Sequence, residues 1–208
     1  MLEFEKKILI TRHEYERLTQ CRYTDGTSYV QTNYYYDTDD CKLNRSGITC
    51  RVRERDGNYK ATVKDHRRKW NECSVENLIS CNGKPDRFFA SIGLECRGSL
   101  KTERTVYAVC PGVNVIVDKN TYLDYTDYEI EIEYDLRFEA AAYREMKDIE
   151  AFISSEAGEP AALEFRKRIG KGGTKSERFF KRKSHMEKVL GKNRSVMNRQ
   201  LPTILRKE

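Results

Sequence analysis

The first seven residues of the chain carry a charge pattern that could bind a metal ion. Glu3, Glu5 and Lys7 alternate with other residues just before the apolar run at 8–10. Because successive side chains of a β-strand point to opposite faces, a strand here would place all three on one face. Carboxylates roughly 6–7 Å apart repel each other unless a cation or a proton lies between them. A solvated edge strand is the plain alternative, and it would be favoured if the pattern stood alone.

A second acidic segment, residues 127–133, repeats the pattern further along the chain. Glu129, Glu131 and Glu133 alternate there with Ile130 and Ile132, so a strand would again gather the acids on one face. The two acidic segments therefore suggest a shared carboxylate site between the first and the last strand of a set.

The predicted strands between these segments are basic. Arg51, Arg53 and Arg55 fall on one face of a strand, and Lys60 and Lys64 fall on one face of its hairpin partner. An ordinary half-exposed sheet also alternates polar with apolar residues. Its exposed face, however, usually mixes the two signs of charge within a strand. The sorting of acids and bases onto different strands therefore needs another explanation.

A barrel with a polar interior offers that explanation. One face of each strand would line the interior, and the other would meet covering helices or solvent. Carboxylates on one wall suit hard divalent cations such as Mg²⁺ or Mn²⁺. Arg and Lys on the other walls suit phosphate oxygens. A compound with several adjacent phosphates would satisfy both walls at once.

Strands in hairpin order are expected to position these residues. Asp56-Gly57 is a hairpin turn signal, and Thr11 with Glu14 forms a capping box that predicts a helix start. Besides the N-terminal segment, the predicted strands are 28–37, 48–55, 58–65, 69–76, 98–109, 113–119 and 126–135, and the predicted helices are 11–21, 137–156 and 174–190. Short strands in this order favour an antiparallel sheet that closes or curls.

The composition excludes several classes of protein. The chain has 208 residues, 38% hydrophobic and 35% charged, and its 13 Tyr and 8 Phe argue against disorder. No run approaches the roughly 20 apolar residues of a membrane span. Acids from residue 3 onward argue against a signal peptide. The seven scattered Cys contain no C-x-x-C pair, which predicts reduced thiols in a cytoplasmic protein.

The net charge of +6 is unevenly distributed. Residues 164–208 hold 15 basic and 4 acidic residues, whereas residues 1–163 hold 24 basic and 29 acidic residues. A polyanion, or an acidic or phosphate-filled site near the 174–190 helix, would account for the basic segment. We divide the chain into a domain at 1–190 and a basic, solvated tail at 191–208. The 174–190 helix would dock through the pair Phe179-Phe180.

In these motifs the chain resembles the CYTH-domain proteins of the triphosphate tunnel metalloenzyme superfamily. The resemblance spans roughly residues 1–135, and the order and spacing of the motifs make it specific. The matching motifs are Glu3-x-Glu5-x-Lys7, Tyr36-Asp37-Thr38 with Leu43 following, Arg51-Val52-Arg53, Thr62-Val63-Lys64, Glu72, Arg104, Asp118 and Asp127-Tyr128-Glu129-Ile130-Glu131.

The resemblance implies an α+β, mainly β fold. Its centre would be a closed eight-stranded antiparallel β-barrel, or tunnel, with flanking helices and a basic C-terminal helix. The implied metal ligands, for Mg²⁺ or Mn²⁺, are Glu3, Glu5, Glu129 and Glu131. The implied substrate-binding residues are Lys7, Arg51, Arg53, Lys60, Lys64 and Arg104, and the candidate catalytic residues are Lys7, Glu72 and Asp118. We expect Glu133 to lie beyond the site in solvent, and His13, His66 and His185 to be structural.

The expected function is metal-dependent hydrolysis of inorganic tripolyphosphate or of an organic triphosphate, such as thiamine triphosphate or a nucleotide. A class IV-type adenylate cyclase needs a purine pocket to which no motif points. A polynucleotide 5′-triphosphatase is favoured slightly by the basic tail. A polyphosphate- or nucleotide-binding module without turnover would not need the duplicated acids. RNA binding lacks an aromatic and basic signature, so the expected partner is a triphosphate or polyphosphate, without nucleic acid or membrane. A monomer and a homodimer both remain open.

Overall fold

The computed structural model describes the backbone of residues 2–70, 73–79 and 86–200, and the side chains of residues 4–66, 87–156 and 158–190. The strands within these residues are β1 (Leu2–Ile10), β2 (Thr27–Asp37), β3 (Ile48–Arg55), β4 (Asn58–Trp70), β5 (Cys73–Ile79), β6 (Glu95–Cys110), β7 (Val113–Tyr122) and β8 (Tyr125–Tyr134). The helices are α1 (Arg12–Arg17), α2 (Lys42–Arg45), α3 (Asp86–Ser91), α4 (Glu139–Arg168) and α5 (Lys175–Gln200), with a π-helical turn at Leu18–Arg22 and a 3-10 turn at Leu136–Phe138.

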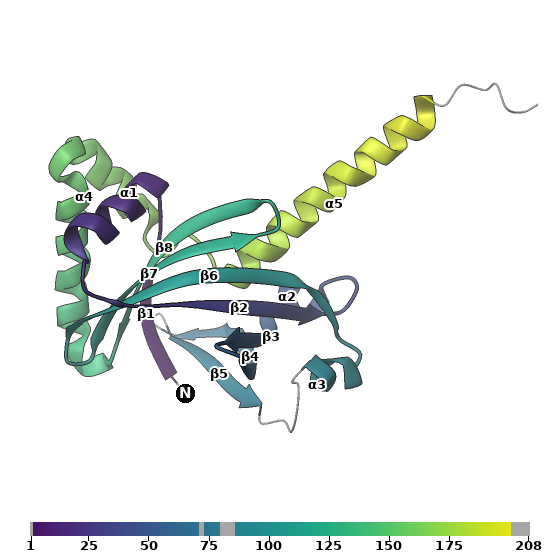
Figure 1. The fold of residues 1–208 in the computed structure, drawn as a ribbon, viewed down its shortest axis with the longest axis horizontal. Coiled ribbons are helices and arrows are strands. Elements are labelled where there is room, and N and C mark those ends of the chain that lie inside the picture. The colour runs from purple at the N-terminus through teal and green to yellow at the C-terminus, as the bar shows by residue number, and fades with distance from the viewer. Residues whose placement is uncertain (1, 71–72, 80–85, 201–208) are drawn as a thin grey trace, which may run out of the picture.

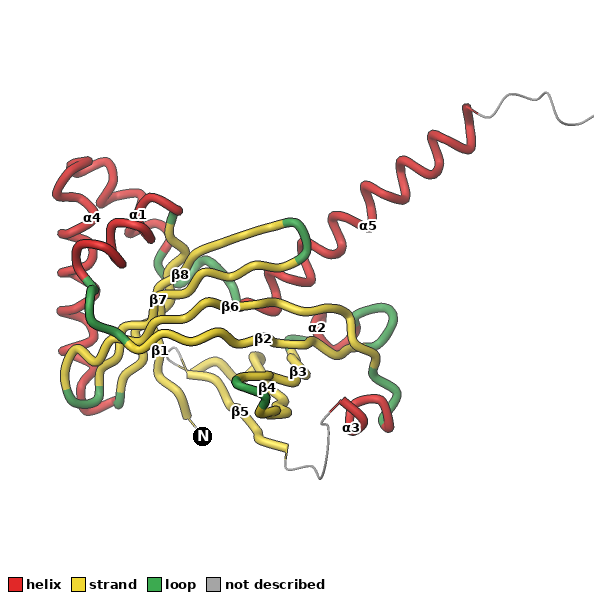
Figure 2. Tube along the Cα trace, in the orientation of Figure 1, coloured by secondary structure: helices red, strands yellow, loops and turns green. Residues whose placement is uncertain are grey.

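The described strands form one antiparallel sheet in the order β1-β5-β4-β3-β2-β6-β7-β8. Strand β1 pairs with β8 along Phe4–Ile10, and with β5 over Leu2–Phe4, so the order returns to β1 through a short contact. The sheet curls strongly, with α1 and α4 at one end (Figures 1 and 2). The mainly β architecture with flanking helices is as predicted from the sequence.

Local sequence signals explain where two of these elements begin. Asp56 and Gly57 both adopt positive φ, as the tight turn between β3 and β4 requires. Thr11 accepts a hydrogen bond from the Glu14 backbone N–H at 3.2 Å, while Glu14 accepts one from the Thr11 backbone N–H at 2.6 Å. This capping box starts α1 immediately after β1, as the sequence predicts.

The outer faces of β1, β7 and β8 are covered by α1 and α4. Along β8, Ile130 and Ile132 belong to the hydrophobic core with Ile149 and Phe165 of α4, whereas Glu129 and Glu131 are buried on the opposite face. Strand β8 is therefore buried on both faces, apolar toward the helices and acidic toward the interior of the curled sheet. A strand that exposed its polar face to water would not bury its acids in this way.

The start of α5 docks on the sheet through Phe179 and Phe180, both buried. The two rings pack in one cluster with Tyr35, Leu100 and Tyr122, which confirms their predicted docking role. Gly98 makes room for this contact, because a Cβ built there would lie 2.8 Å from the Phe179 Cζ atom. Beyond the docked turns, α5 projects away from the sheet as a single helix (Figure 1).

Several predicted boundaries differ from the structure. The strand expected at 69–76 is divided, because β4 continues to Trp70 and β5 begins at Cys73. His66 therefore lies within β4, one residue beyond the strand predicted at 58–65. Helix α4 runs on to Arg168, past a kink at Gly158, and α5 runs ten residues further than expected, to Gln200. In β4, α4 and α5 the regular backbone hydrogen bonds continue past the residues whose hydrophobic periodicity predicted each element.

No helix within the described residues combines the length and the apolar character that crossing a membrane requires.

Candidate active site

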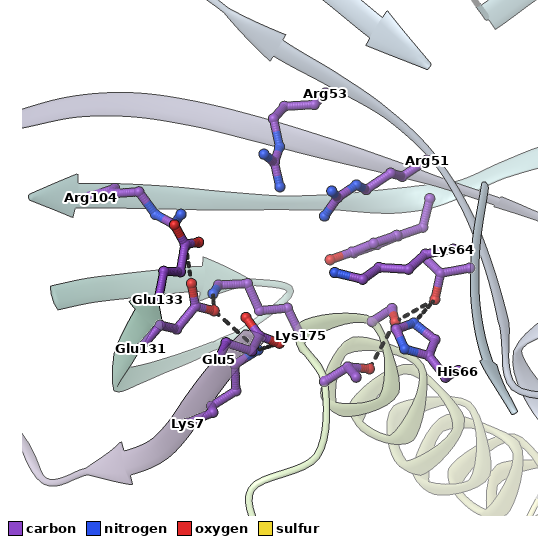
Figure 3. Close-up of a pocket in the computed structure, with 14 residues that line it drawn as sticks. Glu5, Lys7, Arg51, Arg53, Lys64, His66, Arg104, Glu131, Glu133 and Lys175 are labelled. Carbon is purple, nitrogen blue, oxygen red and sulfur yellow. Dashed lines mark hydrogen bonds and ion pairs between the residues drawn. The ribbon is translucent and has the colours of Figure 1, made fainter. Parts of the chain in front are cut away.

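A polar cavity lies inside the curled sheet, next to the first turn of α5 (Figure 3). Its lining residues are Glu5, Lys7, Tyr35, Thr49, Arg51, Arg53, Lys64, His66, Arg104, Glu131, Glu133, Thr174, Lys175 and Ser176. Among these described residues six are Lys or Arg and three are Glu, so the lining carries a formal excess of positive charge. A cavity of this charge favours an anionic ligand.

Glu131 of β8 is the centre of the acidic side of the cavity. It forms ion pairs with Lys7 at 3.1 Å, with Arg104 at 2.6 Å and with Lys175 at 2.8 Å. Burial by itself raises the pKa of a carboxyl group, but Lys175, Lys7 and Arg104 outweigh it and hold the pKa of Glu131 well below its usual range. Glu131 is therefore ionised despite being almost fully buried.

A second cluster of buried charges lies behind Glu131. Arg104 donates two hydrogen bonds to Asp118, from Nε at 2.8 Å and from Nη2 at 2.6 Å. Arg178 of α5 donates to Glu129 at 2.5 Å and to Asp127 at 2.8 Å. Asp118 and Glu129 have no exposed surface. Buried carboxylates at such positions are tolerated because each one faces a cation.

Lys7 and Lys175 keep their positive charge inside this cluster. Burial alone lowers the pKa of a lysine, but nearby carboxylates reverse the shift at both residues. Glu131, Glu129 and Glu5 raise the pKa of Lys7 above its ordinary value. Asp118, Glu129 and Glu131 likewise raise the pKa of Lys175 above its ordinary value. Both ammonium groups are thus charged at any physiological pH.

The opposite side of the cavity is basic and comes from β3 and β4. Arg51 donates from Nε to the Thr62 hydroxyl at 2.9 Å, and Arg53 donates from Nε to the Asn33 side-chain oxygen at 3.0 Å. Lys64 stands beside them on β4, and the three cationic groups point into the space that Glu5, Glu131 and Glu133 face (Figure 3). These hydrogen bonds to Thr62 and Asn33 orient the two guanidinium groups.

Three residues at the start of α5 complete the cavity, and no motif in the sequence singled them out individually. Thr174, Lys175 and Ser176 follow the glycine-rich break at 170–173. Ser176 and Thr49 are hydrogen-bonded at 2.7 Å, and Thr49 also contacts the His66 ring at 3.1 Å. The basic charge of this segment suggested a polyanion, or an acidic or phosphate-filled site, near the helix. Lys175 is buried among carboxylates.

The structure brings most of the predicted site residues together. Those that line the cavity are Glu5, Lys7, Arg51, Arg53, Lys64, Arg104 and Glu131. Asp118 and Glu129 lie directly behind the lining, in contact with Lys175. Glu3 belongs to β1, but its side chain is outside the described part of the chain, as is the whole of Glu72.

One expectation about the site was wrong. Glu133 lines the cavity instead of lying in solvent, because β8 stays in register with β1 as far as Glu5. Lys60 is exposed and does not belong to the lining residues of the described chain. Its predicted role in substrate binding stays a prediction.

The carboxylates of the cavity fit a divalent cation. Oxygen atoms of Glu5, Glu131 and Glu133 lie within 4.8 Å of one another, and so do those of Asp118, Glu129 and Glu131. All of these donors are hard oxygen ligands, which suit Mg²⁺ or Mn²⁺. Glu131 belongs to both sets, which we call the outer trio and the inner trio.

The chain belongs to the CYTH domain family, whose model matches residues 1–159. The resemblance inferred from the sequence is thus confirmed. A Bacillus subtilis protein named "Putative triphosphatase YjbK" is 26% identical over 147 residues, which cover 64% of this chain and 77% of that protein.

Solved structures share the fold at lower identity. A Bacillus halodurans structure described as "a putative adenylate cyclase" superposes with a TM-score of 0.55 at 21% identity, covering 71% of this chain and 89% of the other. The Hippeastrum protein HpAC1, described as a "putative adenylyl cyclase" with a dominant triphosphatase activity, superposes with a TM-score of 0.53 at 18% identity, covering 71% and 87%. These likenesses support the fold.

Proposed function

We propose that this protein hydrolyses a terminal phosphoanhydride bond of a triphosphate bound in the cavity, with the help of a divalent metal ion. The observation that carries the proposal is the lining itself, in which cations from β1, β3, β4, β6 and α5 surround a group of carboxylates. Cations alone would suffice to bind an anion. Ionised carboxylates among them are useful where a metal ion links them to the phosphates.

The basic side would bind and orient the phosphate chain. The planar forks of Arg51 and Arg53 suit phosphate oxygens, and Lys64 adds a point charge beside them. Arg104 and Lys7 lie nearer the carboxylates, where they would stabilise the charge that develops on the leaving phosphate. The reaction needs no covalent intermediate, since water adds to the terminal phosphorus as the bridging P–O bond breaks.

The acidic side would hold the metal and the attacking water. Glu5 and Glu133 are partly exposed to the cavity, so either one can accept a hydrogen bond or a proton from that water. A divalent ion bound by the outer trio would supply charge neutralisation and bring the phosphate oxygens to the carboxylates. We keep Lys7 and Asp118 as catalytic candidates: Lys7 touches the outer trio, and Asp118 fixes the orientation of Arg104.

Inorganic tripolyphosphate is our first choice of substrate. Tyr35 and His66 supply the aromatic rings among the described lining residues. Tyr35 is buried against Phe179 with the ring centroids 5.1 Å apart, and the His66 ring contacts the Thr49 hydroxyl at 3.1 Å. The described lining thus presents no free ring on which a purine or thiazole could stack. We place the reaction in the cytoplasm, since the described cysteines are free thiols. The curled sheet would act in solution as a tunnel closed by the β1–β5 contact.

The decisive experiment is phosphate release from tripolyphosphate, ATP, thiamine triphosphate and long-chain polyphosphate, each with Mg²⁺ or Mn²⁺. We expect the highest kcat/KM with tripolyphosphate and none without metal. Pyrophosphate and cyclic AMP are assayed as products of ATP. Their formation without phosphate release would favour the cyclase alternative, whereas tight binding of tripolyphosphate without any turnover would leave a binding module.

A further inference from the structure

The two acidic trios share Glu131 but differ in their exposure and in their contacts with lysine. Lys7 contacts two members of the outer trio, Glu5 at 3.3 Å and Glu131 at 3.1 Å. The outer trio faces the cavity, with Glu5 and Glu133 only partly buried. The inner trio is formed by fully buried Asp118 and Glu129 together with Glu131. An ion that arrives with a ligand from the cavity therefore meets the outer trio first.

The inner trio already contains a cation, the ammonium group of Lys175. Its Nζ atom lies 2.8 Å from Asp118 Oδ2 and 2.8 Å from Glu131 Oε1, and it also contacts Glu129. The lysine therefore touches an oxygen of all three carboxylates that could surround a metal ion. Figure 3 shows it reaching from the first turn of α5 to Glu131.

An ammonium group and a divalent ion cannot share this position. Mg²⁺ binds oxygen at about 2.0–2.1 Å and needs its ligands to converge on one point. Here the oxygens of the inner trio converge on the lysine nitrogen at hydrogen-bonding distance. Two positive charges at the same point would also repel each other strongly in a buried environment.

The lysine is held there by the docking of α5. Phe179 and Phe180 anchor the helix one turn further on, and Ser176, the next residue, is hydrogen-bonded to Thr49. Arg178 binds Glu129 from the same helix. Lys175 could therefore leave the inner trio only if its side chain swung into the cavity or the helix start undocked.

We propose that Lys175 is a built-in counter-ion that takes the place of a second divalent metal, so that the protein binds a single divalent ion, in the outer trio. This inference rests on the proposed function, because it assumes that the outer trio binds metal. It deepens that function by fixing the metal stoichiometry and by giving α5 a role in it. With one metal ion bound, Lys175 and Arg178 of α5 stabilise the inner carboxylates in place of a second ion.

The test measures metal binding directly, without turnover. Mn²⁺ is titrated into the metal-free protein, and the free ion is counted by electron paramagnetic resonance with isothermal titration calorimetry in parallel. We expect the native protein to bind one Mn²⁺ per chain. Lys175→Met should bind a second ion at the inner trio, and Mg²⁺ should raise the Tm of this variant by several degrees more than that of the native protein.

Lys181→Met is the matched control, since Lys181 is an exposed lysine of the same helix. It should bind one ion, as the native protein does. Lys175→Met binding the same single ion as the control, with no extra Mg²⁺-dependent gain in Tm, would overturn the proposal. If Lys175→Met fails to fold, the native titration still decides, because two ions per native chain would refute it. No binding of Mn²⁺ to the native protein would instead refute the proposed metal-dependent function.

Discussion

The acidic and the basic side of the cavity hold their charges in different ways. On the acidic side, Glu131 forms ion pairs with Lys7, Arg104 and Lys175, and Glu129 forms one with Arg178. The opposite charges therefore neutralise each other within the protein. On the basic side, the guanidinium groups of Arg51 and Arg53 are oriented by the neutral Thr62 and Asn33.

This difference separates two uses of buried charge. Desolvating an ion pair is costly, so the protein fixes its inner acids with several cations each. Hydrogen bonds to neutral acceptors fix the geometry of the Arg51 and Arg53 guanidinium groups before a ligand arrives. The acidic side is thus a rigid set of ion pairs, whereas the basic side presents oriented guanidinium groups to the cavity.

Glu131→Gln should produce the largest effect, because this residue joins both trios and three cations. We expect kcat with tripolyphosphate to fall at least about 100-fold, in line with the loss of a metal-site carboxylate and its partners. Steady-state phosphate release measures the change. Glu103→Gln is the control, because Glu103 forms an exposed ion pair with Lys119 at 3.2 Å, and it should keep native activity. Equal rates in the two variants would place the chemistry elsewhere.

Arg53→Ala tests the basic side. Loss of a charged group that binds phosphate should raise the KM for tripolyphosphate about 10- to 100-fold, and added salt should weaken binding less steeply than in the native protein. Arg55→Ala is the matched control, because Arg55 lies two residues along β3, is exposed and stacks over Tyr29. Equal changes in KM for both variants would indicate diffuse attraction by surface charge in place of an ordered basic side.

Gly98→Ala tests how much the docking of α5 contributes to stability, since this docking places Lys175 and Arg178 on the acidic side. Gly98 has φ +135°, and its added Cβ would lie 2.8 Å from the Phe179 ring. Backbone strain together with this clash should cost roughly 2–4 kcal/mol in the free energy of unfolding, measured in urea. Gly93→Ala separates the two effects, because Gly93 has φ +78° and open space around it, and it should cost roughly 1 kcal/mol. A smaller loss at Gly98 than at Gly93 would contradict the packing argument.

The ion pair of Glu14 with Arg168 should show the smallest effect, because it lies outside the cavity. Arg168 donates to Glu14 at 2.8 and 2.5 Å. Burial raises the pKa of Glu14, but Arg168 and the Thr11 backbone outweigh it, so the pKa lies below its ordinary value of 4.5. A carboxyl group whose pKa is lower in the folded state than in the unfolded state stabilises the protein fully above the unfolded-state pKa. This contribution is lost as the pH falls through the folded-state pKa.

Glu14→Gln should therefore reduce the free energy of unfolding by roughly 1–2 kcal/mol at pH 7, with activity unchanged. Urea denaturation from pH 7 down to pH 3 should show this difference shrinking below about pH 4.5. A difference that stays constant over the whole range would mean that the carboxylate charge contributes nothing. Loss of activity in this variant would show that the Glu14–Arg168 ion pair also supports catalysis, against the expectation.

Strand periodicity predicted much of the candidate site. The alternation at Glu5 and Lys7, at Arg51 and Arg53, and along β8 assigns each side chain to one face, and the sorting of charge shows which strands oppose each other. These features are local, since a period of two residues is all that a strand needs to separate its faces.

The sequence by itself thus determined the antiparallel strands, the segregation of acids from bases and the apolar pair that docks α5. Lys175, Ser176 and His66 became site residues only in the folded chain, because their positions follow from contacts between different elements, such as Lys175 with Glu131 and Ser176 with Thr49. The pairing of Glu133 with Glu5 likewise decided that Glu133 lines the cavity. Such long-range contacts leave no periodic trace, since each depends on how two distant surfaces meet rather than on the spacing of neighbours along one element.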